Sequence, residues 1–413
     1  MAFDALRGWS ATQRHVVAAS YLGWTLDAFD FLLITYVASD IAKSFGTNTK
    51  GVTWVITATL LMRPIGAFIF GRLADRFGRR PILMLDVALY SIIAFASAFA
   101  PNLTVFIILR CLFGIAMGGE WGIGASLTME HVKPESRGFV SGLLQTGYPT
   151  GGMIAGVVSG LLLPHFDTEL GWRVCVMTSV IPSLLVLYIR RNVPESPTFA
   201  QSRAPRDNTF AVLRSHWGIA LFAIVLMTGF NTLSHGSQDL YPKFLRDQIH
   251  LTPALSSFIG SVGPLGAILG GLTFGMLSQR IGRRRAITIS AILVLPLIYF
   301  WVFFSVNPSV LAFTAFLLQF GVQGAWGVVP AHLNELSPHD ARGTFPGFVY
   351  QLGNLFSAGI VLGQGVLIDD YSWTFAQALA LMTGAAALLI AVLINLGPEA
   401  REVDMATGKP AGG

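Results

Sequence analysis

Two ten-residue stretches decide how this chain is organised: residues 71–80 read GRLADRFGRR, and residues 275–284 read GMLSQRIGRR. Further residues repeat at nearly the same separation. The segment GEWG at 119–122 returns as GAWG at 324–327, Glu130 returns as Glu335, and Arg137-Gly138 returns as Arg342-Gly343. The repeated positions keep their order along the chain. The sequence therefore predicts two halves of the same design arranged as a parallel repeat.

The chain is far more apolar than a soluble protein of its length. Of its 413 residues, 53% are hydrophobic and 12% are charged, whereas about 25% of an average soluble domain is charged. The apolar runs are long and continuous, as at 82–100 and 286–304, and a helix that crosses a bilayer needs about 20 such residues. A membrane β-barrel would instead show alternating segments of about ten residues. These features predict an all-α membrane protein.

Twelve apolar runs are expected to cross the membrane, six in each half. They lie near 15–43, 50–74, 80–99, 103–130, 137–163, 171–190, 216–246, 253–278, 284–305, 308–335, 343–368 and 374–396. The longest hydrophilic stretch, rich in proline and arginine, separates the two sets. We therefore expect an N-terminal six-helix half at 1–190, a linker at 191–215, a C-terminal six-helix half at 216–397 and a tail at 398–413.

Lysine and arginine concentrate in alternate turns between the apolar runs. They follow the second, fourth, sixth and eighth runs, whereas the turns after the third and ninth runs carry none. Positive loops mark the cytoplasmic side of a membrane protein. We therefore expect both termini in the cytoplasm and the bundle in the plasma membrane, which is the inner membrane in a bacterium. Orientation explains the net charge of +5 better than nucleic-acid binding does.

The repeated GRLADRFGRR stretch resembles the signature loop of the major facilitator superfamily, and with its second copy the resemblance covers essentially the whole chain. It implies the major facilitator fold, in which twelve transmembrane helices form two pseudo-symmetric six-helix halves. It also implies secondary active transport by alternating access. Separately, we expect the chain to function as a monomer.

The resemblance further implies a cytoplasmic gate. In the superfamily role of this loop, Asp75 caps a neighbouring helix and pairs with an arginine, which holds the halves together and biases the inward/outward balance. The second copy has Gln279 in place of the aspartate, so we expect a charged latch in the N-terminal half only. The expected gate residues are Gly71, Asp75, Arg76, Gly78 and Arg79, with Glu130–Arg137 and Glu335–Arg342 as companion ion pairs.

A narrower resemblance lies at residues 231–243, which read NTLSHGSQDLYPK. This segment resembles the N-x-x-[ST]-H-x-[ST]-Q-D-x-x-x-T signature of Jen-type lactate permeases, within the sialate:proton symporter group, and departs from it at Lys243. The resemblance implies proton-coupled import of short monocarboxylates such as lactate, pyruvate or acetate. It also implies substrate roles for an arginine early in the second span, here Arg63, and for Gln351 and Asn354 in the eleventh.

Ionisable residues inside the apolar runs are functional candidates, because an unpaired charge at membrane depth costs several kcal/mol. Asp27 and Asp30 lie three apart on one helix face. Two carboxylates so close repel each other, which suits a site that loads and releases a proton; alternatively, either one forms a structural ion pair with Arg110. Glu120 lies nearer the cytoplasm and suits either a proton relay or an inner gate.

Arg63 is a candidate for binding the substrate carboxylate, because a guanidinium offers a fixed positive charge and a fork of donors. Asp27 or Asp30 could compete for it, which would couple substrate to proton. The alternative is a salt bridge that only packs helices together.

Asn231, His235, Gln238 and Asp239 lie on one face of the seventh span. His235 and Asp239 can hydrogen-bond to each other and form a titrating pair, although Asp239 could instead serve an outer gate. Gln145 and Tyr148 add neutral polar groups near mid-depth, and an ordinary interhelical hydrogen bond explains them equally well.

Other classes of protein lack support in the sequence. No motif for a metalloprotease, a serine hydrolase or a nucleotide-binding loop occurs, which argues against an enzyme and against an ATP-driven pump. We find no motif for a metal or cofactor. The expected partners are a small organic anion, protons and the lipid bilayer. A symporter for a larger acid such as sialate, a monocarboxylate uniporter and a transporter-like sensor remain alternatives.

Overall fold

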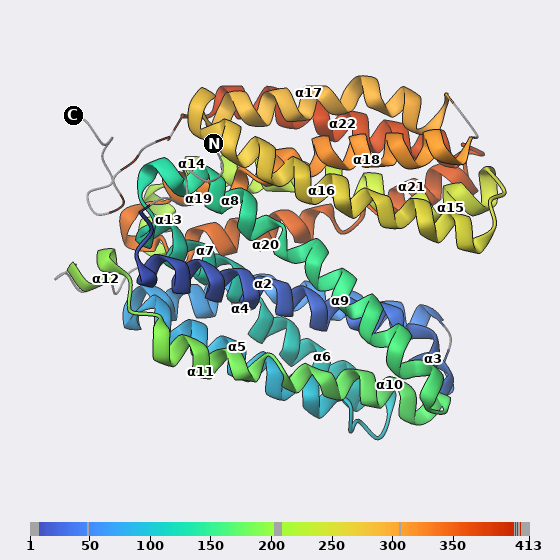
Figure 1. Ribbon diagram of the computed structural model, residues 1–413, viewed down its shortest axis with the longest axis horizontal. Coiled ribbons are helices and arrows are strands. Elements are labelled where there is room, and N and C mark those ends of the chain that lie inside the picture. Colours follow the sequence, from blue (N-terminus) through green and yellow to red (C-terminus); the bar gives the residue numbers. More distant parts are fainter. Residues whose placement is uncertain are drawn as a thin grey trace.

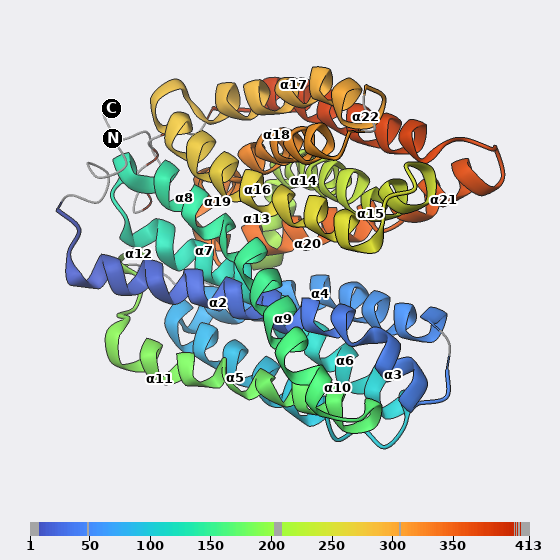
Figure 2. The same cartoon turned by 45° about the vertical axis from the view of Figure 1, so that its right-hand side comes forward.

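The computed structural model describes residues 8–47, 49–201, 209–304 and 307–399, together with residues 401, 403 and 405. Its described part is a bundle of helices that forms two side-by-side halves, coloured blue to green and yellow to red in Figures 1 and 2. Eleven helical stretches of this described part are long and apolar enough to cross a membrane.

The N-terminal half contains the spans expected before the linker. Its helices are α2 (Ala11–Tyr36), α3 (Ala38–Ser44), α4 (Thr49–Phe77), α5 (Arg79–Ser97), α6 (Leu103–Met117), α7 (Glu120–His131), α8 (Arg137–Gln145), α9 (Gly147–Leu162), α10 (Thr168–Met177) and α11 (Ser183–Asn192). Two short helices, α12 (Pro197–Gln201) and α13 (Thr209–Ser215), occupy part of the predicted linker.

The C-terminal half repeats this order. Its helices are α14 (Trp217–Gln238), α15 (Tyr241–Lys243), α16 (Pro253–Ile281), α17 (Arg283–Val302), α18 (Pro308–Trp326), α19 (Val329–Leu336), α20 (Phe345–Ser357), α21 (Ile360–Asp369) and α22 (Phe375–Leu396).

Several expected spans are interrupted near their middle, and proline explains three of the interruptions. Pro149 has no N–H to donate to the carbonyl of Gln145, four residues earlier, so the helix breaks between α8 and α9. The fifth expected span, 137–163, is not among the eleven long apolar stretches. Pro182 and Pro330 act in the same way between α10 and α11 and between α18 and α19.

The two copies of the signature stretch form the same turn. Gly78 and Gly282 precede α5 and α17 with φ angles of 106° and 99°, a backbone region that glycine adopts without strain. The carboxylate of Glu195 then accepts hydrogen bonds from the N–H groups of Arg79 and Arg80 at 2.9 and 3.2 Å. Glu399 caps α17 in the same way. In each half, a glutamate that closely follows the last long helix therefore caps the start of the third long helix.

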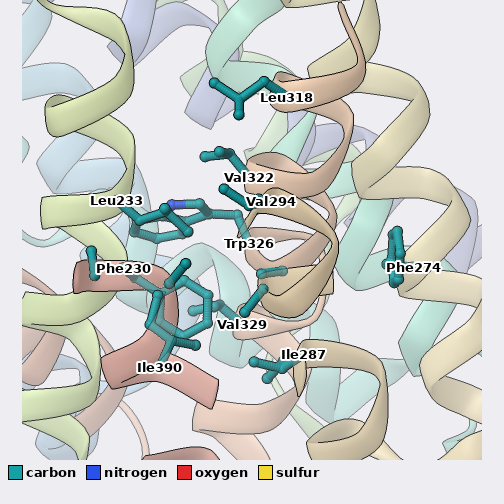
Figure 3. Packing of buried hydrophobic residues seen from close by; sticks show 14 of the residues in the cluster. Phe230, Leu233, Phe274, Ile287, Val294, Leu318, Val322, Trp326, Val329 and Ile390 are labelled. Carbon is teal, nitrogen blue, oxygen red and sulfur yellow. The ribbon is translucent and has the colours of Figure 1, made fainter. Parts of the chain in front are cut away.

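The hydrophobic core of the C-terminal half extends into the N-terminal half. Figure 3 shows Trp326 of α18 pointing toward Phe230 and Leu233 of α14, with ring centroids of Trp326 and Phe230 5.3 Å apart. The same buried cluster contains Trp24 and Trp121 of the N-terminal half. Side chains of both halves therefore pack together at the centre of the molecule.

Candidate functional site

Outside the signature stretch and its ion pairs, six acidic and arginine side chains are buried within helices of the N-terminal half. Each is at most 2% exposed: Asp27 and Asp30 of α2, Arg63 of α4, Asp86 of α5, Arg110 of α6 and Glu120 of α7. No group of three or more histidine, cysteine or acidic side chains with metal-binding geometry occurs in the described residues. The cluster is therefore one of acids and guanidinium groups from five helices.

Arg63 has no carboxylate within 4.0 Å among the described residues. Its Nη2 lies 2.7 Å from the sulfur of Met117, and its guanidinium lies 4.7 Å from the centroid of the Phe31 ring. Its Nε has no hydrogen-bond partner in the part of the chain described here. A buried cation held by a sulfur and a ring face keeps donors available for an anion.

The contact ion pair between Asp27 or Asp30 and Arg110, the alternative to a proton-carrying role, does not occur among the described residues. The guanidinium of Arg110 instead lies 3.8 Å from the centroid of the Phe113 ring. The charges still interact at longer range, because Asp27 is attracted by both Arg63 and Arg110. Each arginine thus lies over a phenylalanine ring rather than against a carboxylate of the described residues.

The cluster also contains a second pair of acids. Neither carboxylate oxygen of Glu120, and neither of Asp86, has a hydrogen-bond partner among the described residues. Asp86 interacts electrostatically with Glu120 and with Asp27. The sequence analysis missed Asp86, although an aspartate inside the apolar run 82–100 is the same signal that singled out Asp27.

The polar face of α14 lies across from these charges in the C-terminal half. His235 Nδ1 and Asp239 Oδ2 are 3.0 Å apart, and the two side chains are 38% and 39% exposed. His235 also interacts with the side chain of Asn354 of α20 and lies within electrostatic range of Arg63. Gln238 donates to Gln319 at 2.9 Å, whereas Asn231 is buried and donates to the Met227 carbonyl of its own helix. The structure thus brings His235, Asp239 and Asn354 together near Arg63.

The remaining predicted polar residues line the same central region. Gln145 accepts a hydrogen bond from the indole N–H of Trp121 at 3.2 Å. Gln351 is buried, and its Oε1 has no partner among the residues described. Tyr148 is half-buried and packs on Trp24, with ring centroids 5.4 Å apart.

The halves meet at one end of the bundle, which we call the motif end because it contains both signature stretches. The Asp75 carboxylate accepts hydrogen bonds from the N–H groups of Gly343 and Thr344 at 2.7 and 3.0 Å and from the Thr344 hydroxyl at 2.7 Å. Thr344 directly precedes α20, so Asp75 caps a helix of the other half. Arg79 lies 3.3 Å from the same carboxylate.

The second signature stretch makes the equivalent contact with the other half through an uncharged side chain. Gln279 Oε1 accepts a hydrogen bond from the Gly138 N–H at 3.2 Å, and Gly138 is the counterpart of Gly343 in the repeat. A Cβ at Gly71 would come within 2.6 Å of the Thr344 Cα, so this position needs glycine for the close approach. Arg76 lies at the surface with its guanidinium 5.2 Å from the Phe77 ring centroid.

The companion ion pairs run across the halves, which corrects the expected pairing. Arg342 lies 3.9 Å from Glu130, and Arg137 lies 3.9 Å from Glu335. Within each half, the glutamate is paired with the arginine after the signature glycine. Glu130 lies 3.3 Å from Arg79, and Glu335 lies 2.9 Å from Arg283. The expected Glu130–Arg137 and Glu335–Arg342 pairs were wrong because the pseudo-twofold arrangement places each of these arginines against the opposite half.

The C-terminal tail lies over this junction. Arg137 donates to the Val403 carbonyl at 2.6 Å, and Arg342 donates to the Met405 carbonyl at 2.5 Å. Met405 is only 3% exposed and packs in a small cluster that includes Val17, Val140 and Ala331. The tail therefore contacts both halves at the motif end.

Two helical halves around a buried charged centre, closed at one end by reciprocal contacts, define a membrane transporter. The model of the Major Facilitator Superfamily matches residues 17–238 and 239–411. The chain belongs to the Major Facilitator Superfamily, and it is an integral membrane transporter rather than an enzyme.

Relatives support this assignment. The chain is 32% identical to a protein of Cupriavidus pinatubonensis named probable 4-methylmuconolactone transporter, over 87% of this chain and 84% of that protein. It is 30% identical to the sialic acid transporter NanX of Escherichia coli, over 83% and 84%. It is 27% identical to a carboxylic acid transporter protein homolog of Saccharomyces cerevisiae, over 94% and 68%.

Among solved structures, the proton:xylose symporter XylE superposes with a TM-score of 0.80 at 17% identity, over 97% of this chain and 98% of that chain. This likeness shows the fold.

Proposed function

We propose that the protein is a proton-coupled symporter that imports a small monocarboxylate, such as lactate, pyruvate or acetate, by alternating access. In this proposal Arg63 binds the substrate carboxylate, Asp27 and Asp30 carry the coupled proton, and His235, Gln351 and Asn354 complete the site from the C-terminal half.

The observation that carries the proposal is the buried guanidinium of Arg63, which has no carboxylate within 4.0 Å among the described residues. An unpaired buried cation is costly, and a substrate carboxylate supplies the missing charge and accepts from the available donors. A zwitterion or a neutral sugar would leave this site incompletely balanced.

The balance of buried charges supports proton coupling. Four acids, Asp27, Asp30, Asp86 and Glu120, share the interior with two arginines, and all six side chains are at most 2% exposed. Full ionisation would leave two negative charges unbalanced in an apolar interior, which costs several kcal/mol. Protons neutralise such groups most directly, so the centre is suited to take up and release them.

Competition for Arg63 supplies the coupling step. Asp27 attracts Arg63 while it is ionised, and a proton on Asp27 removes that attraction and frees the guanidinium for the substrate. Release of the proton would restore the competition and expel the anion. Substrate and proton would therefore enter and leave together.

The names of the relatives favour an organic acid as substrate without fixing which one. They include transporters named for a muconolactone, for carboxylic acids, for sialic acid and for niacin. A larger acid such as sialate is the second candidate, favoured by the 30% identity to the sialic acid transporter. If transport does not depend on the proton gradient, the protein is instead a monocarboxylate uniporter.

We further propose that the motif end faces the cytoplasm of the cell's plasma membrane, with both termini on that side, and that a monomer is sufficient for transport. The arginines that follow the second, fourth and eighth expected spans support this orientation. In this orientation the closed motif end would seal the cytoplasmic side.

Uptake of radiolabelled L-lactate into proteoliposomes tests the proposal. An inward proton gradient should drive accumulation, and collapse of the gradient should abolish it. Arg63→Ala should abolish uptake, whereas Trp54→Leu, at a 66% exposed residue of the same helix, should leave it unchanged. Saturable uptake indifferent to pH would refute the coupling, and uptake of sialate in place of lactate would refute the substrate class.

A further inference from the structure

Five aromatic side chains meet at the centre of the molecule, and we call them the aromatic floor: Trp24, Trp121, Tyr148, Trp326 and Tyr350. Tyr350 lies in the middle, with ring centroids 4.6 Å from Trp121, 5.7 Å from Trp326 and 6.5 Å from Trp24. Tyr148 packs on Trp24 at 5.4 Å. The five rings come from α2, α7, α9, α18 and α20, so both halves contribute.

The repeat itself supplies two of these rings. Trp121 and Trp326 occupy the equivalent position of the GEWG and GAWG segments. Each indole is fixed by a hydrogen bond, from Trp121 to Gln145 at 3.2 Å and from Trp326 to the Ser234 hydroxyl at 2.6 Å. Their converging rings are therefore held in defined orientations on the two sides of Tyr350.

One polar group of the aromatic floor lacks a hydrogen-bond partner among the described residues. The indole N–H of Trp24, a residue 4% exposed, has no hydrogen-bond partner among the described residues. Arg63 acts electrostatically on the phenols of both Tyr148 and Tyr350. The floor thus combines ring faces, an unpaired buried donor and a nearby cation that lacks an anion.

We infer that the preferred substrate among the monocarboxylates is one whose carboxyl group is attached to a flat, unsaturated ring. Its carboxylate would bind Arg63 and its ring would stack against the aromatic floor. Flat rings gain from offset or edge-to-face contact with aromatic side chains beyond the area that they bury. Acetate and lactate offer only a methyl group to these five rings. The inference rests on the proposed function and narrows its substrate class.

Benzoate and cyclohexanecarboxylate form a matched pair of probes, because both carry seven carbons and one negative charge at neutral pH, and only benzoate is flat. Their dissociation constants for the purified full-length protein in detergent can be measured by titration calorimetry. We expect benzoate to bind at least tenfold more tightly than cyclohexanecarboxylate, and more tightly than lactate. Wild-type protein suffices for this comparison, so no variant needs to fold.

Substitutions then test whether the aromatic floor causes the preference for benzoate over cyclohexanecarboxylate. Trp121→Leu should reduce the benzoate preference to less than about threefold, Trp121→Phe should retain most of it, and the exposed control Trp54→Leu should leave it unchanged. Equal affinities for the two probes, in protein that carries out proton-driven lactate uptake, would overturn the inference and leave the proposed function standing. Absence of binding and uptake for every monocarboxylate tested would overturn both.

Discussion

Replacement of Asp75 by alanine should open the motif end. In the closed form the Asp75 carboxylate accepts three hydrogen bonds from the other half, at 2.7, 3.0 and 2.7 Å. Asp75→Ala removes all three and leaves two N–H groups at the start of α20 without their acceptor. In the open form water can solvate these groups, so the substitution destabilises the closed form selectively.

The magnitude follows from the number and charge of the lost contacts. A hydrogen bond to a charged group contributes about 1.5–3 kcal/mol net, and contacts that share one carboxylate add incompletely. We therefore expect a loss of about 2–4 kcal/mol, which shifts the ratio of closed to open forms by roughly 30- to 900-fold.

The repeat provides the matched control. Gln279→Ala removes one neutral hydrogen bond, to Gly138 at 3.2 Å, which is worth about 1 kcal/mol or roughly fivefold. Asp75→Asn should fall between the two, because it keeps one oxygen acceptor and loses the charge.

Alkylation of a buried cysteine measures the open fraction. Ala331 is fully buried, and its N–H is bonded to Ser141 of the other half at 3.0 Å. Ala331→Cys, placed in a chain with Cys111 and Cys175 replaced by alanine, should react slowly with maleimide in the otherwise unchanged protein. Labelling should be much faster with Asp75→Ala and only slightly faster with Gln279→Ala. Equal labelling rates for these two variants would refute the assignment of the charged latch to Asp75.

Three further substitutions probe other features. Gly275→Leu should abolish uptake in a folded protein and speed labelling at position 331, because a Cβ at residue 275 comes within 2.6 Å of the Gly138 carbonyl oxygen. Gly260→Leu is the control, because a Cβ at residue 260 meets nothing within 4 Å. Normal uptake by Gly275→Leu would contradict the close packing of the two halves. Truncation after residue 401 removes the Val403 and Met405 carbonyls that accept hydrogen bonds from Arg137 and Arg342. The labelling rate at position 331 should therefore rise, but by less than with Asp75→Ala. An unchanged labelling rate would show that the tail does not hold the motif end closed. His235→Gln should lower lactate uptake at least tenfold. It should lower the free energy of unfolding by less than about 1 kcal/mol, because the His235–Asp239 pair is more than a third exposed. A large fall in melting temperature with unchanged uptake would show that the pair is structural.

Much of the fold could be predicted from the sequence because its signals are local. Long apolar runs define the helices, and the copies at 71–80 and 275–284 identify the repeat and its family. The break after Gln145 was also visible in principle, because Pro149 removes a specific hydrogen bond. The bounds of individual spans depend on such local details more than on hydropathy.

The pairing of distant groups could not be predicted in the same way. Arg137 and Arg342 each lie seven residues after the glutamate of their own half, so spacing favours the within-half pairs that the structure replaces with crossed ones. Asp86 could have been found from its apolar run. The aromatic floor could not, because the meeting of Trp121, Trp326 and Tyr350 depends on how α20 packs against helices of both halves. The roles of the predicted site residues stay predictions.

Comparison of exchange with accumulation in Asp27→Asn tests the central claim most directly. Asparagine imitates the protonated acid, so Arg63 stays free and the substrate can bind and exchange, whereas no proton can be coupled at this position. The account predicts that Asp27→Asn proteoliposomes exchange internal for external labelled lactate at a rate close to that of the unsubstituted protein, and that a proton gradient no longer drives accumulation. Gradient-driven accumulation that persists in Asp27→Asn would contradict the account.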